Sequence, residues 1–370
     1  MNIIFVISHL PDSRYKKRFE VLKPGNDVSA IYWNKRGNKE QPIVDIDIPS
    51  TGINIEANQT SPFKRIPQWF FYAKAALAEL KKQAPDFIYV GNFDMLAIAW
   101  QYKKSHPSVR VIYEIADLHR YIADVPRNPA RKIFRRMLIA AESNLMKIVD
   151  LLVITSREFY KSYYYQYITE EKVVFLPNMP RKEDFADYSK KQDGPFTVGF
   201  IGSIRYKEQL KMLIRAAKRA DVKVIFAGAA TDSEIEDLCK ENADYCKFLG
   251  PFNYTRRIAQ LYGMLDCVYS VYDADMANVR IALPNKLYEA ILCELPIIVA
   301  KNTYLAKLTE QWGVGIAVSH KQEDELVDAL LELKNNKARY DEICQNCRKN
   351  QYRVSLEKYN ALLRDFIENK

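Results

Sequence analysis

The sequence predicts an α/β protein made of two doubly wound, Rossmann-like domains. Short apolar runs alternate with helical stretches along the chain, which is typical of buried parallel strands joined by crossover helices. The length of 370 residues is more than one hydrophobic core usually organises. The alternating pattern stops near residue 178 and starts again at residue 196, so we expect two similar halves.

Six apolar runs in the first half are predicted to form strands, with helices in the gaps between them. Each run is short and rich in Ile, Val, Leu, Phe or Tyr, as buried strands are. They lie at Ile3–Ile7, Val28–Trp33, Asp86–Val90, Val109–Glu114, Leu151–Ile154 and Val173–Leu176. We therefore predict an N-terminal domain over residues 1–178.

Residues 179–195 lose the apolar periodicity and carry many charges and two prolines, so we predict a linker there. A second domain is expected over residues 196–340. Its predicted elements are strands at Phe196–Ile201, Val222–Ala227, Lys247–Leu249, Cys267–Val271 and Pro296–Ala300, and a helix at Lys207–Arg219. Residues 341–370 are helical in pattern and could return to brace the first domain.

Charge and cysteine usage narrow the class of protein. A formal net charge of +9 suits phosphorylated small molecules or an anionic membrane, and no nucleic-acid-binding module is recognised. The first apolar run is too short and too closely followed by charges for a signal peptide, and no apolar run is long enough to span a bilayer. All six cysteines lie in the C-terminal half, several in apolar segments, as free thiols do. We expect a cytoplasmic protein.

Pro284, Lys286 and Glu289 precede the apolar run that ends at Ala300. Lys286 and Glu289 are three residues apart, so they share one face of a short helix. Doubly wound sheets bind ligands at the carboxyl ends of their strands, where a carboxylate could hold a ribose diol and a lysine a phosphate. A surface ion pair is the alternative interpretation.

A second candidate phosphate site follows the predicted strand Phe196–Ile201. Gly202 and Ser203 end this strand, and Arg205 and Lys207 lie next to a predicted helix start. Backbone amides and cations in this arrangement suit a phosphate, although ordinary loop chemistry is an equal alternative. The glycine spacing matches neither a dinucleotide fingerprint nor a P-loop.

Residues 284–299, with residues 198–205 upstream, resemble the donor domain of GT-B glycosyltransferases (group 1, family 4-like) that build bacterial capsule and surface polysaccharides. Residues 11–19, 85–92, 111–118 and 175–178 look like acceptor-domain signatures of the same family, in the same order. The resemblance covers most of the chain. It implies a GT-B fold, in which two Rossmann-like domains face an interdomain cleft.

The resemblance also implies roles for particular residues. Glu289 would hydrogen-bond the donor ribose, and Lys286 with Arg205 would neutralise the leaving diphosphate as its charge grows. The remaining candidates are Gly202, Ser203, Lys207 and Asn285 for the nucleotide, and His9 and Arg280 for the donor sugar or the acceptor. No metal or other cofactor is expected.

The stereochemistry stays open, because Ile281 stands where many retaining relatives carry a second glutamate, eight residues before Glu289. An inverting enzyme needs a general base for the acceptor hydroxyl. Asp117 is one candidate, since it follows the strand Val109–Glu114, and His119 is the rival. A helix N-cap is the structural alternative for Asp117.

Two basic segments in the first half suggest contact with a membrane. A basic amphipathic helix is expected between Arg127 and Lys147, and the segment from Lys64 to Lys74 mixes aromatic residues with cations. The residues proposed for this surface are Arg131, Lys132, Arg135, Arg136 and Trp69. Packing of the apolar faces into the domain core is the alternative; otherwise these cations would attract an anionic inner leaflet.

Together these features predict a metal-independent glycosyltransferase, bound peripherally to the inner face of the cell membrane. It would move a sugar from a nucleotide-diphosphate sugar to a lipid-linked surface glycan, and UDP is favoured by its frequency in the family. A nucleotide-sugar epimerase of the same architecture and a catalytically inactive partner subunit are the alternatives. Neither the sugar nor the linkage is predicted.

Overall fold

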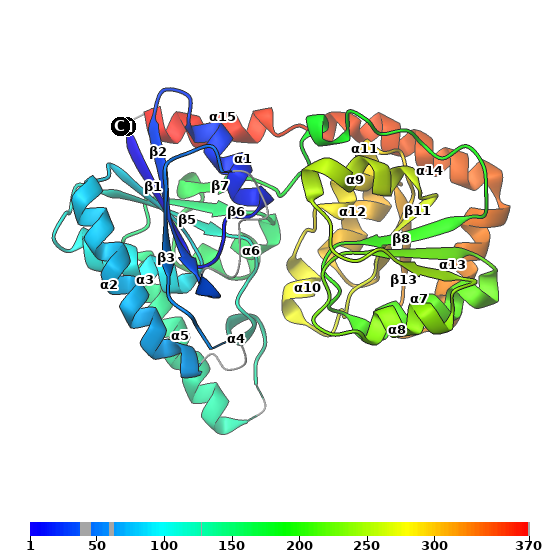
Figure 1. Cartoon of the computed structure of the whole chain (residues 1–370), viewed down its shortest axis with the longest axis horizontal. Helices are drawn as coiled ribbons and strands as arrows, with labels where there is room; N and C mark the ends of the chain where they lie inside the picture. Colours follow the sequence, from blue (N-terminus) through cyan, green and yellow to red (C-terminus); the bar gives the residue numbers. More distant parts are fainter. Residues whose placement is uncertain (38–45, 59–62, 127, 369–370) are drawn as a thin grey trace. The chain divides into compact units, whose positions relative to one another are not determined.

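The computed structural model describes residues 1–37, 46–58, 63–126 and 128–368 (Figure 1). The chain forms two compact units. Unit 1 comprises Met1–Pro177 and Glu357–Lys370, and unit 2 comprises Asn178–Leu356. Each unit is a parallel sheet with helices around it, so the predicted α/β class with two doubly wound domains is confirmed.

Unit 1 contains a seven-stranded parallel sheet in the order β3-β2-β1-β4-β5-β6-β7. The strands are β1 (Asn2–Ile7), β2 (Asp27–Asn34), β3 (Ser50–Asn54), β4 (Phe87–Gly91), β5 (Arg110–Ile115), β6 (Leu151–Ile154) and β7 (Val173–Phe175). All six predicted strands are present. The edge strand β3 was missed, because its sequence Ser-Thr-Gly-Ile-Asn has one large apolar residue and no buried position.

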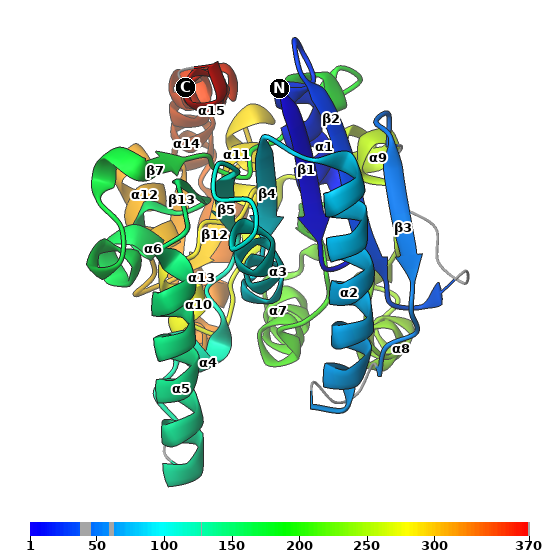
Figure 2. The ribbon, with the colours of Figure 1, turned by 90° about the vertical axis from the view of Figure 1, so that its left-hand side faces the viewer.

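Seven α-helices surround this sheet in the described part of unit 1. They are α1 (Ser13–Leu22), α2 (Ile66–Gln83), α3 (Phe93–Lys103), α4 (Arg120–Ala123), α5 (Pro129–Met146), α6 (Arg157–Ser162) and α15 (Glu357–Glu368). Asn128 caps α5 by accepting from the backbone N–H of Arg131, and Pro129 suits the first turn. Figures 1 and 2 show that α2 and α5 both begin at the end of unit 1 where its strands end, and that α5 extends beyond the sheet.

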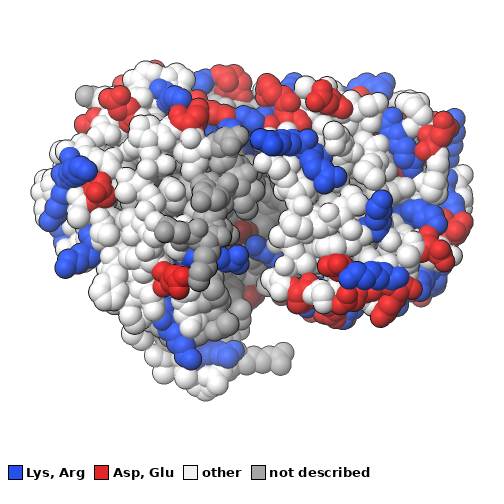
Figure 3. Space-filling view, in the orientation of Figure 1, with Lys and Arg blue, Asp and Glu red and all other residues white. Residues whose placement is uncertain are grey.

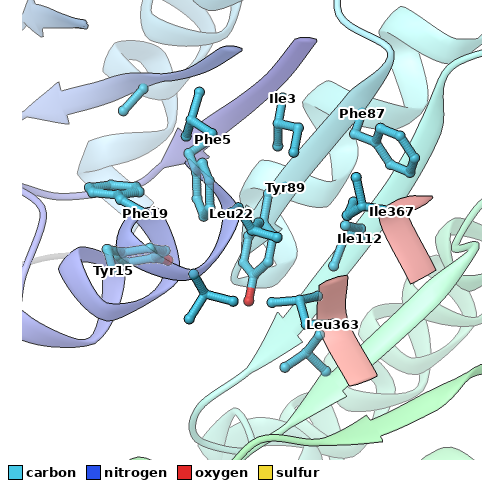
Figure 4. Close-up of a cluster of buried hydrophobic side chains, with 14 of the residues drawn as sticks. Ile3, Phe5, Tyr15, Phe19, Leu22, Phe87, Tyr89, Ile112, Leu363 and Ile367 are labelled. Atoms are coloured by element: carbon cyan, nitrogen blue, oxygen red, sulfur yellow. The ribbon is translucent and has the colours of Figure 1, made fainter. Parts of the chain in front are cut away.

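The C-terminal helix α15 completes the core of unit 1. Leu363 and Ile367 are fully buried beside Phe87 and Ile112 of the sheet (Figure 4). The Arg110 guanidinium also lies 4.0 Å from the centre of the Phe366 ring. A helix far away in sequence therefore covers apolar surface of the sheet that would otherwise be exposed to water.

Unit 2 contains a six-stranded parallel sheet in the order β10-β9-β8-β11-β12-β13. Its strands are β8 (Thr197–Ile201), β9 (Lys223–Ala227), β10 (Cys246–Phe248), β11 (Cys267–Ser270), β12 (Ile297–Ala300) and β13 (Gly315–Val318). Its α-helices are α7 (Lys207–Ala220), α8 (Glu234–Glu241), α9 (Tyr254–Gly263), α10 (Ala277–Ile281), α11 (Lys286–Leu292), α12 (Tyr304–Trp312), α13 (Glu323–Asn335) and α14 (Lys337–Asn350). The short edge strand β13 was missed in the sequence.

Two segment boundaries differ from those expected. The segment expected to link the domains packs onto unit 2, because Met179 and Phe185 are buried and the Phe185 ring lies 5.6 Å from the Tyr262 ring. Helix α14 also belongs to unit 2, where its apolar side is buried through Ile343 and Cys347. Only residues from Glu357 onward join unit 1, so the start expected at residue 341 comes too early.

The strand order places a switch point in each sheet, between β1 and β4 in unit 1 and between β8 and β11 in unit 2. Open α/β sheets bind ligands beside such points, at the carboxyl ends of the strands. All six cysteines are buried and unpaired by disulfides. Across the described residues, no helix combines the length and apolar character that a membrane span requires.

Candidate functional site

Lys286 opens α11 beside the carboxyl end of β8, at the switch point of unit 2. Its side chain is only 6% exposed, and its ammonium nitrogen lies 4.7 Å from the centre of the Phe200 ring and 5.7 Å from that of Tyr272. A Cβ added to Gly202 would lie 2.8 Å from this nitrogen, and the φ of Gly202 is +141°. Glycine adopts this backbone conformation without strain, and its missing side chain leaves the space that the Lys286 ammonium occupies.

Glu289, one turn further along α11, is 1% exposed and fully engaged by hydrogen bonds. One carboxylate oxygen accepts from the Tyr254 hydroxyl at 2.5 Å and from the Asn285 amide at 2.6 Å, and the other accepts from the Tyr262 hydroxyl. Burial, reinforced by the charge of Glu289, raises the pKa values of both tyrosines well above their ordinary value. A ribose hydroxyl could reach this carboxylate only by displacing one of these donors.

Lys286 and Glu289 share α11 but do not form an ion pair with each other among the described residues. Lys286 faces two aromatic rings and Gly202, whereas Glu289 faces Tyr254, Tyr262 and Asn285. The structure therefore contradicts the alternative of a surface ion pair, because both side chains are buried. Asn285, predicted to contact the nucleotide, donates a hydrogen bond to Glu289.

Of the two candidate cations after β8, Arg205 is accessible and Lys207 is engaged in ion pairs. Arg205 is exposed, and its Nε donates to the Ser203 hydroxyl at 3.0 Å. Lys207 forms ion pairs with Asp232 and with Glu234, the latter at 2.8 Å. The hydrogen bonds that Lys207 donates to these carboxylates raise its pKa. Arg205 is therefore better placed than Lys207 to meet a phosphate.

Arg280 has a structural contact that sequence reasoning did not foresee. Its guanidinium donates to the backbone carbonyls of Ala274 at 3.1 Å and Asp275 at 2.8 Å, and so fixes the loop between β11 and α10. Neighbouring Ile281 ends α10. The structure gives neither residue a contact that tests its role toward a donor sugar.

Asp273, Asp275 and His320 form the set in the described chain that could hold a metal ion. Their potential ligand atoms lie within 4.8 Å of one another, beside a cavity of 790 Å³ that Arg205 also lines. Asp273 and Asp275 have the Asp-x-Asp spacing that many metal-dependent enzymes use, a signal that the sequence reasoning missed. Lys321 already pairs with Asp275, and its hydrogen bond is the main cause of a lowered Asp275 pKa.

Unit 1 has its own cavity of 750 Å³ at the carboxyl ends of β4 and β5. Asp117, His119 and Trp69, three of the predicted site residues, all line it. Asp117 and His119 are exposed. The carbonyl of His119 accepts from the N–H groups of Ile122 and Ala123, so the backbone of His119 takes the N-cap position of α4. The roles of the Asp117 side chain as a base or as a cap both stay predictions.

His9 follows β1 and lies beside the N-terminus of α1. Its Nε2 is 3.6 Å from the carboxylate of Asp12, and its Nδ1 is 3.3 Å from the Ser8 hydroxyl. Asp12 in turn caps α1 by accepting from the N–H groups of Arg14 and Tyr15. Burial would raise the pKa of Asp12, but the His9 hydrogen bond and the Arg14 charge together lower it below its ordinary value. The contacts with Asp12 and Ser8 thus fix the position of the His9 ring.

A buried ion pair supports the floor of the unit 1 cavity. Glu114, in β5 as expected, accepts from the Arg18 guanidinium at 3.1 Å and from the Tyr89 hydroxyl at 2.5 Å. Arg14 lies 4.0 Å away. Burial would raise the pKa of Glu114, but the two arginines overcome it and lower the pKa. The charged form of the buried carboxylate is thus stabilised by the two arginines.

Two further carboxylates line this cavity and were missed in the sequence. Asp94 lies in the first turn of α3, directly after β4, and Glu142 lies on α5. Asp94 could have been found, because it follows a predicted strand at a position where open sheets bind ligands. Glu142 could not have been found, because nothing in the sequence distinguishes it from the solvent-facing charged residues of a basic helix.

The start of α5 and the start of α2 form an exposed basic and apolar surface. Ile133 and Met137 on α5 are 61% and 66% exposed, and Phe70 and Phe71 on α2 are 62% and 66% exposed. Arg131, Lys132 and Arg136 are exposed as well, whereas Arg135 donates to the carbonyl of Ile122; Arg127 lies outside the described residues. Figure 3 shows Lys and Arg side chains at the tip of unit 1 where α5 begins.

The expected alternative, in which these apolar faces pack into the core, holds for the end of α5 and for part of α2. Leu145 and Met146 on α5 and Tyr72 on α2 are buried, while Ile133 and Met137 are not. Exposed large apolar groups among cations are typical of surfaces that meet a membrane or another macromolecule.

Comparison with known proteins agrees with this architecture. Residues 180–354 match the family model described as glycosyl transferases group 1. The succinoglycan biosynthesis protein ExoL of Rhizobium meliloti (strain 1021) is 24% identical over 357 residues, covering 91% of this chain and 85% of ExoL.

Solved structures share the fold over the whole chain. Sucrose-phosphate synthase from Thermosynechococcus elongatus matches with a TM-score of 0.73 at 14% identity, covering 100% of this chain and 99% of that one. Anabaena HepE in complex with UDP matches with a TM-score of 0.68 at 15% identity, covering 100% of both chains. The lipopolysaccharide glycosyltransferase WaaG matches with a TM-score of 0.72 at 13% identity, covering 99% of both chains. Residues 180–354 therefore form a glycosyl transferases group 1 domain, and the chain is a glycosyltransferase of the GT-B fold.

Proposed function

We propose that this glycosyltransferase moves a sugar from a UDP-sugar to a lipid-linked glycan of a bacterial surface polysaccharide, without a metal ion. The observation that carries the donor half of this proposal is the buried ammonium of Lys286 beside Gly202 at the switch point of unit 2. A buried cation without a carboxylate partner is costly unless a ligand supplies the anion.

UDP is favoured as the donor nucleotide because HepE, which shares the fold, has been solved with UDP and with UDP-glucose. In this chain, Lys286 and the exposed Arg205 would meet the diphosphate and stabilise the charge that grows on it as the sugar leaves. Glu289 would take a ribose hydroxyl in place of the Tyr254 hydroxyl that it now binds. This exchange would conserve the number of hydrogen bonds to a buried carboxylate.

Metal independence follows from the same cations, since they supply the positive charge that a divalent ion would otherwise provide. The set of Asp273, Asp275 and His320 fits a cation only in part, because Lys321 occupies one of the carboxylates. We therefore assign this set to the structure of the loop. Chelation of divalent ions is expected to leave UDP binding unchanged.

The acceptor is placed in unit 1, where Asp117 and His119 line the cavity and remain the candidates for a general base. Either group could take the proton of an attacking hydroxyl if the reaction inverts. The glycan assignment rests on the relative ExoL, which carries the description of a succinoglycan biosynthesis protein. Membership of a transferase family favours transfer over epimerisation.

Attachment to an anionic inner membrane leaflet would bring a lipid-linked acceptor to this cavity. Arg131, Lys132 and Arg136 would contribute about 1 kcal/mol each near such a surface. Ile133 and Met137 would add apolar contact with the headgroup region. The same end of unit 1 carries the start of α2, including Trp69, which lines the cavity.

Calorimetric titration with UDP, GDP and NAD tests the donor assignment, on the wild type and on Glu289→Gln. We expect UDP to bind and the variant to bind it about tenfold or more weakly, as expected for loss of a hydrogen bond to a charged group. Glu323→Gln, at an exposed ion pair with Arg215, is the matched control and should bind as the wild type does. Failure of every nucleoside diphosphate to bind, or equal binding by Glu289→Gln, would contradict the proposed donor site.

The same UDP titration in the presence of EDTA tests metal independence.

A further inference from the structure

The unit 1 cavity has a composition that points to one chemical class of ligand. Aromatic residues line it, among them Trp69, which is partly exposed, and Trp33, Tyr113 and Tyr164, which are only 1%, 2% and 1% exposed. Such rings provide flat apolar surface at little entropic cost and stack on the C–H faces of a sugar ring. The cavity volume of 750 Å³ is ample for a pyranose and part of its neighbour.

The polar groups in the wall are mainly hydrogen-bond acceptors. Four acidic residues line the cavity, Asp94, Glu114, Asp117 and Glu142, together with the basic residues Lys35 and Arg65. The charge of Glu114 is already balanced by the buried Arg18. Carboxylates accept hydrogen bonds and so bind hydroxyl groups well, whereas they repel phosphate or another carboxylate.

Asp94 lies in the first turn of α3, directly after β4, and lines the cavity. When ionised, its carboxylate offers about four acceptor positions for hydroxyl groups. Asp94 also stands next to the switch point between β1 and β4, where doubly wound sheets bind ligands.

Glu142 is held by two tyrosines instead of by cations. The Tyr163 and Tyr164 hydroxyls each donate to it at 2.8 Å. Burial is the main cause of a raised pKa for this carboxyl group, and burial likewise raises the pKa of Asp94. Both groups are thus costly to keep charged, and a second anion placed nearby would increase that cost.

We infer that this cavity binds the terminal sugar of the acceptor as an uncharged pyranose, with Asp94 and Glu142 facing its hydroxyls and Trp69 facing its apolar side. The inference rests on the proposed function and specifies its acceptor. The inference predicts that the carboxylates lining the cavity repel sugars that themselves carry a carboxylate, such as a uronic acid. A donor sugar has the same chemistry as an acceptor sugar, so the test must separate the two sources.

Saturation-transfer NMR on the full chain can measure this selectivity with methyl β-D-glucopyranoside, methyl β-D-galactopyranoside and methyl β-D-glucuronide. We expect at least one neutral glycoside to bind, and the glucuronide to bind about fivefold or more weakly, since like charges are costly in a partly desolvated site. Asp94→Asn should weaken the neutral glycoside about tenfold and narrow the difference from the glucuronide. Asp47→Asn, at an exposed pair with Lys23 in the same unit, is the matched control.

Two further arms make the result decisive. UDP affinity should be the same in the wild type and in Asp94→Asn, and Glu142→Gln offers a second variant should the first fail to fold. UDP alone and UDP-glucose should both leave the neutral glycoside bound. Equal or tighter binding of the glucuronide, or displacement of the glycoside by UDP-glucose but not by UDP, would overturn the inference. Loss of UDP binding by the wild type would instead contradict the donor proposal.

Discussion

Replacement of Lys286 by Met separates a ligand-binding role of this lysine from a structural one. Methionine preserves the length and apolar stem of the side chain and removes the charge. The ammonium lies 4.7 Å and 5.7 Å from the centres of two aromatic rings, and its side chain is 6% exposed. The ring contacts offset part of the cost of burying the charge, by about 0.5–2 kcal/mol.

The magnitude expected for binding follows from the charge-assisted hydrogen bond to a diphosphate oxygen. Loss of such a bond costs about 1.5–3 kcal/mol, which corresponds to roughly 10- to 150-fold weaker UDP binding. Stability should change little or increase slightly, because a buried ammonium with no carboxylate partner among the described residues is replaced by an apolar group of similar volume.

The assay combines calorimetric UDP titration at low and high salt with thermal unfolding. Lys301→Met, at an exposed ion pair with Glu325 in the same unit, is the matched control and should bind UDP as the wild type does. A Lys286→Met protein that unfolds at a lower temperature but binds UDP within about twofold of the wild type would refute the reasoning, because the lysine would then be structural.

Three further predictions concern unit 1 and its surface. Leu363→Ala should destabilise unit 1 by about 2–5 kcal/mol, seen in chemical denaturation, because it leaves a cavity under the sheet; an unchanged midpoint would mean that α15 is not part of the core. Glu114→Gln should cost about 3–5 kcal/mol by leaving a buried arginine unpaired. The pKa of Glu114 is lowered in the folded state, so its contribution to the free energy of unfolding is present above the unfolded pKa of about 4.3 and is lost as the pH falls through the folded pKa. Acid titration of the wild type and of Glu114→Gln will show this difference. The double substitution Ile133→Ser with Met137→Ser should reduce cosedimentation with anionic vesicles about tenfold or more without lowering the unfolding temperature; unchanged cosedimentation would remove α5 from the membrane surface.

The fold was predictable where burial shapes the sequence. The central strands of both sheets are buried on both faces, so each appears as a continuous apolar run. The edge strand β3 has no such run, because none of its positions is buried, whereas β13, Gly-Ile-Ala-Val, is a short apolar run that was overlooked. The attachment of α14 to unit 2 and of α15 to unit 1 depends on which sheet their apolar sides meet, and periodicity alone does not contain that information.

The candidate site was predictable in position more than in detail. Lys286, Glu289 and Gly202 were singled out because they follow strands, and the structure brings Lys286 and Gly202 together. The tyrosines that hold Glu289 come from α9, about 30 residues earlier in the chain, and no local pattern connects them to it. Asp94 follows a predicted strand but was not predicted, because the strand order that places the switch point beside β4 cannot be read from the sequence.

The most direct test of the account is transfer of radiolabel from UDP-sugars to a lipid extract of the native membrane. The protein is incubated with labelled UDP-glucose or UDP-galactose, and the organic phase and the released nucleotide are both quantified. We predict that label enters the lipid fraction in proportion to the UDP released, and that Lys286→Met reduces both together. Conversion of one UDP-sugar into another with no label in lipid would contradict the account and indicate an epimerase.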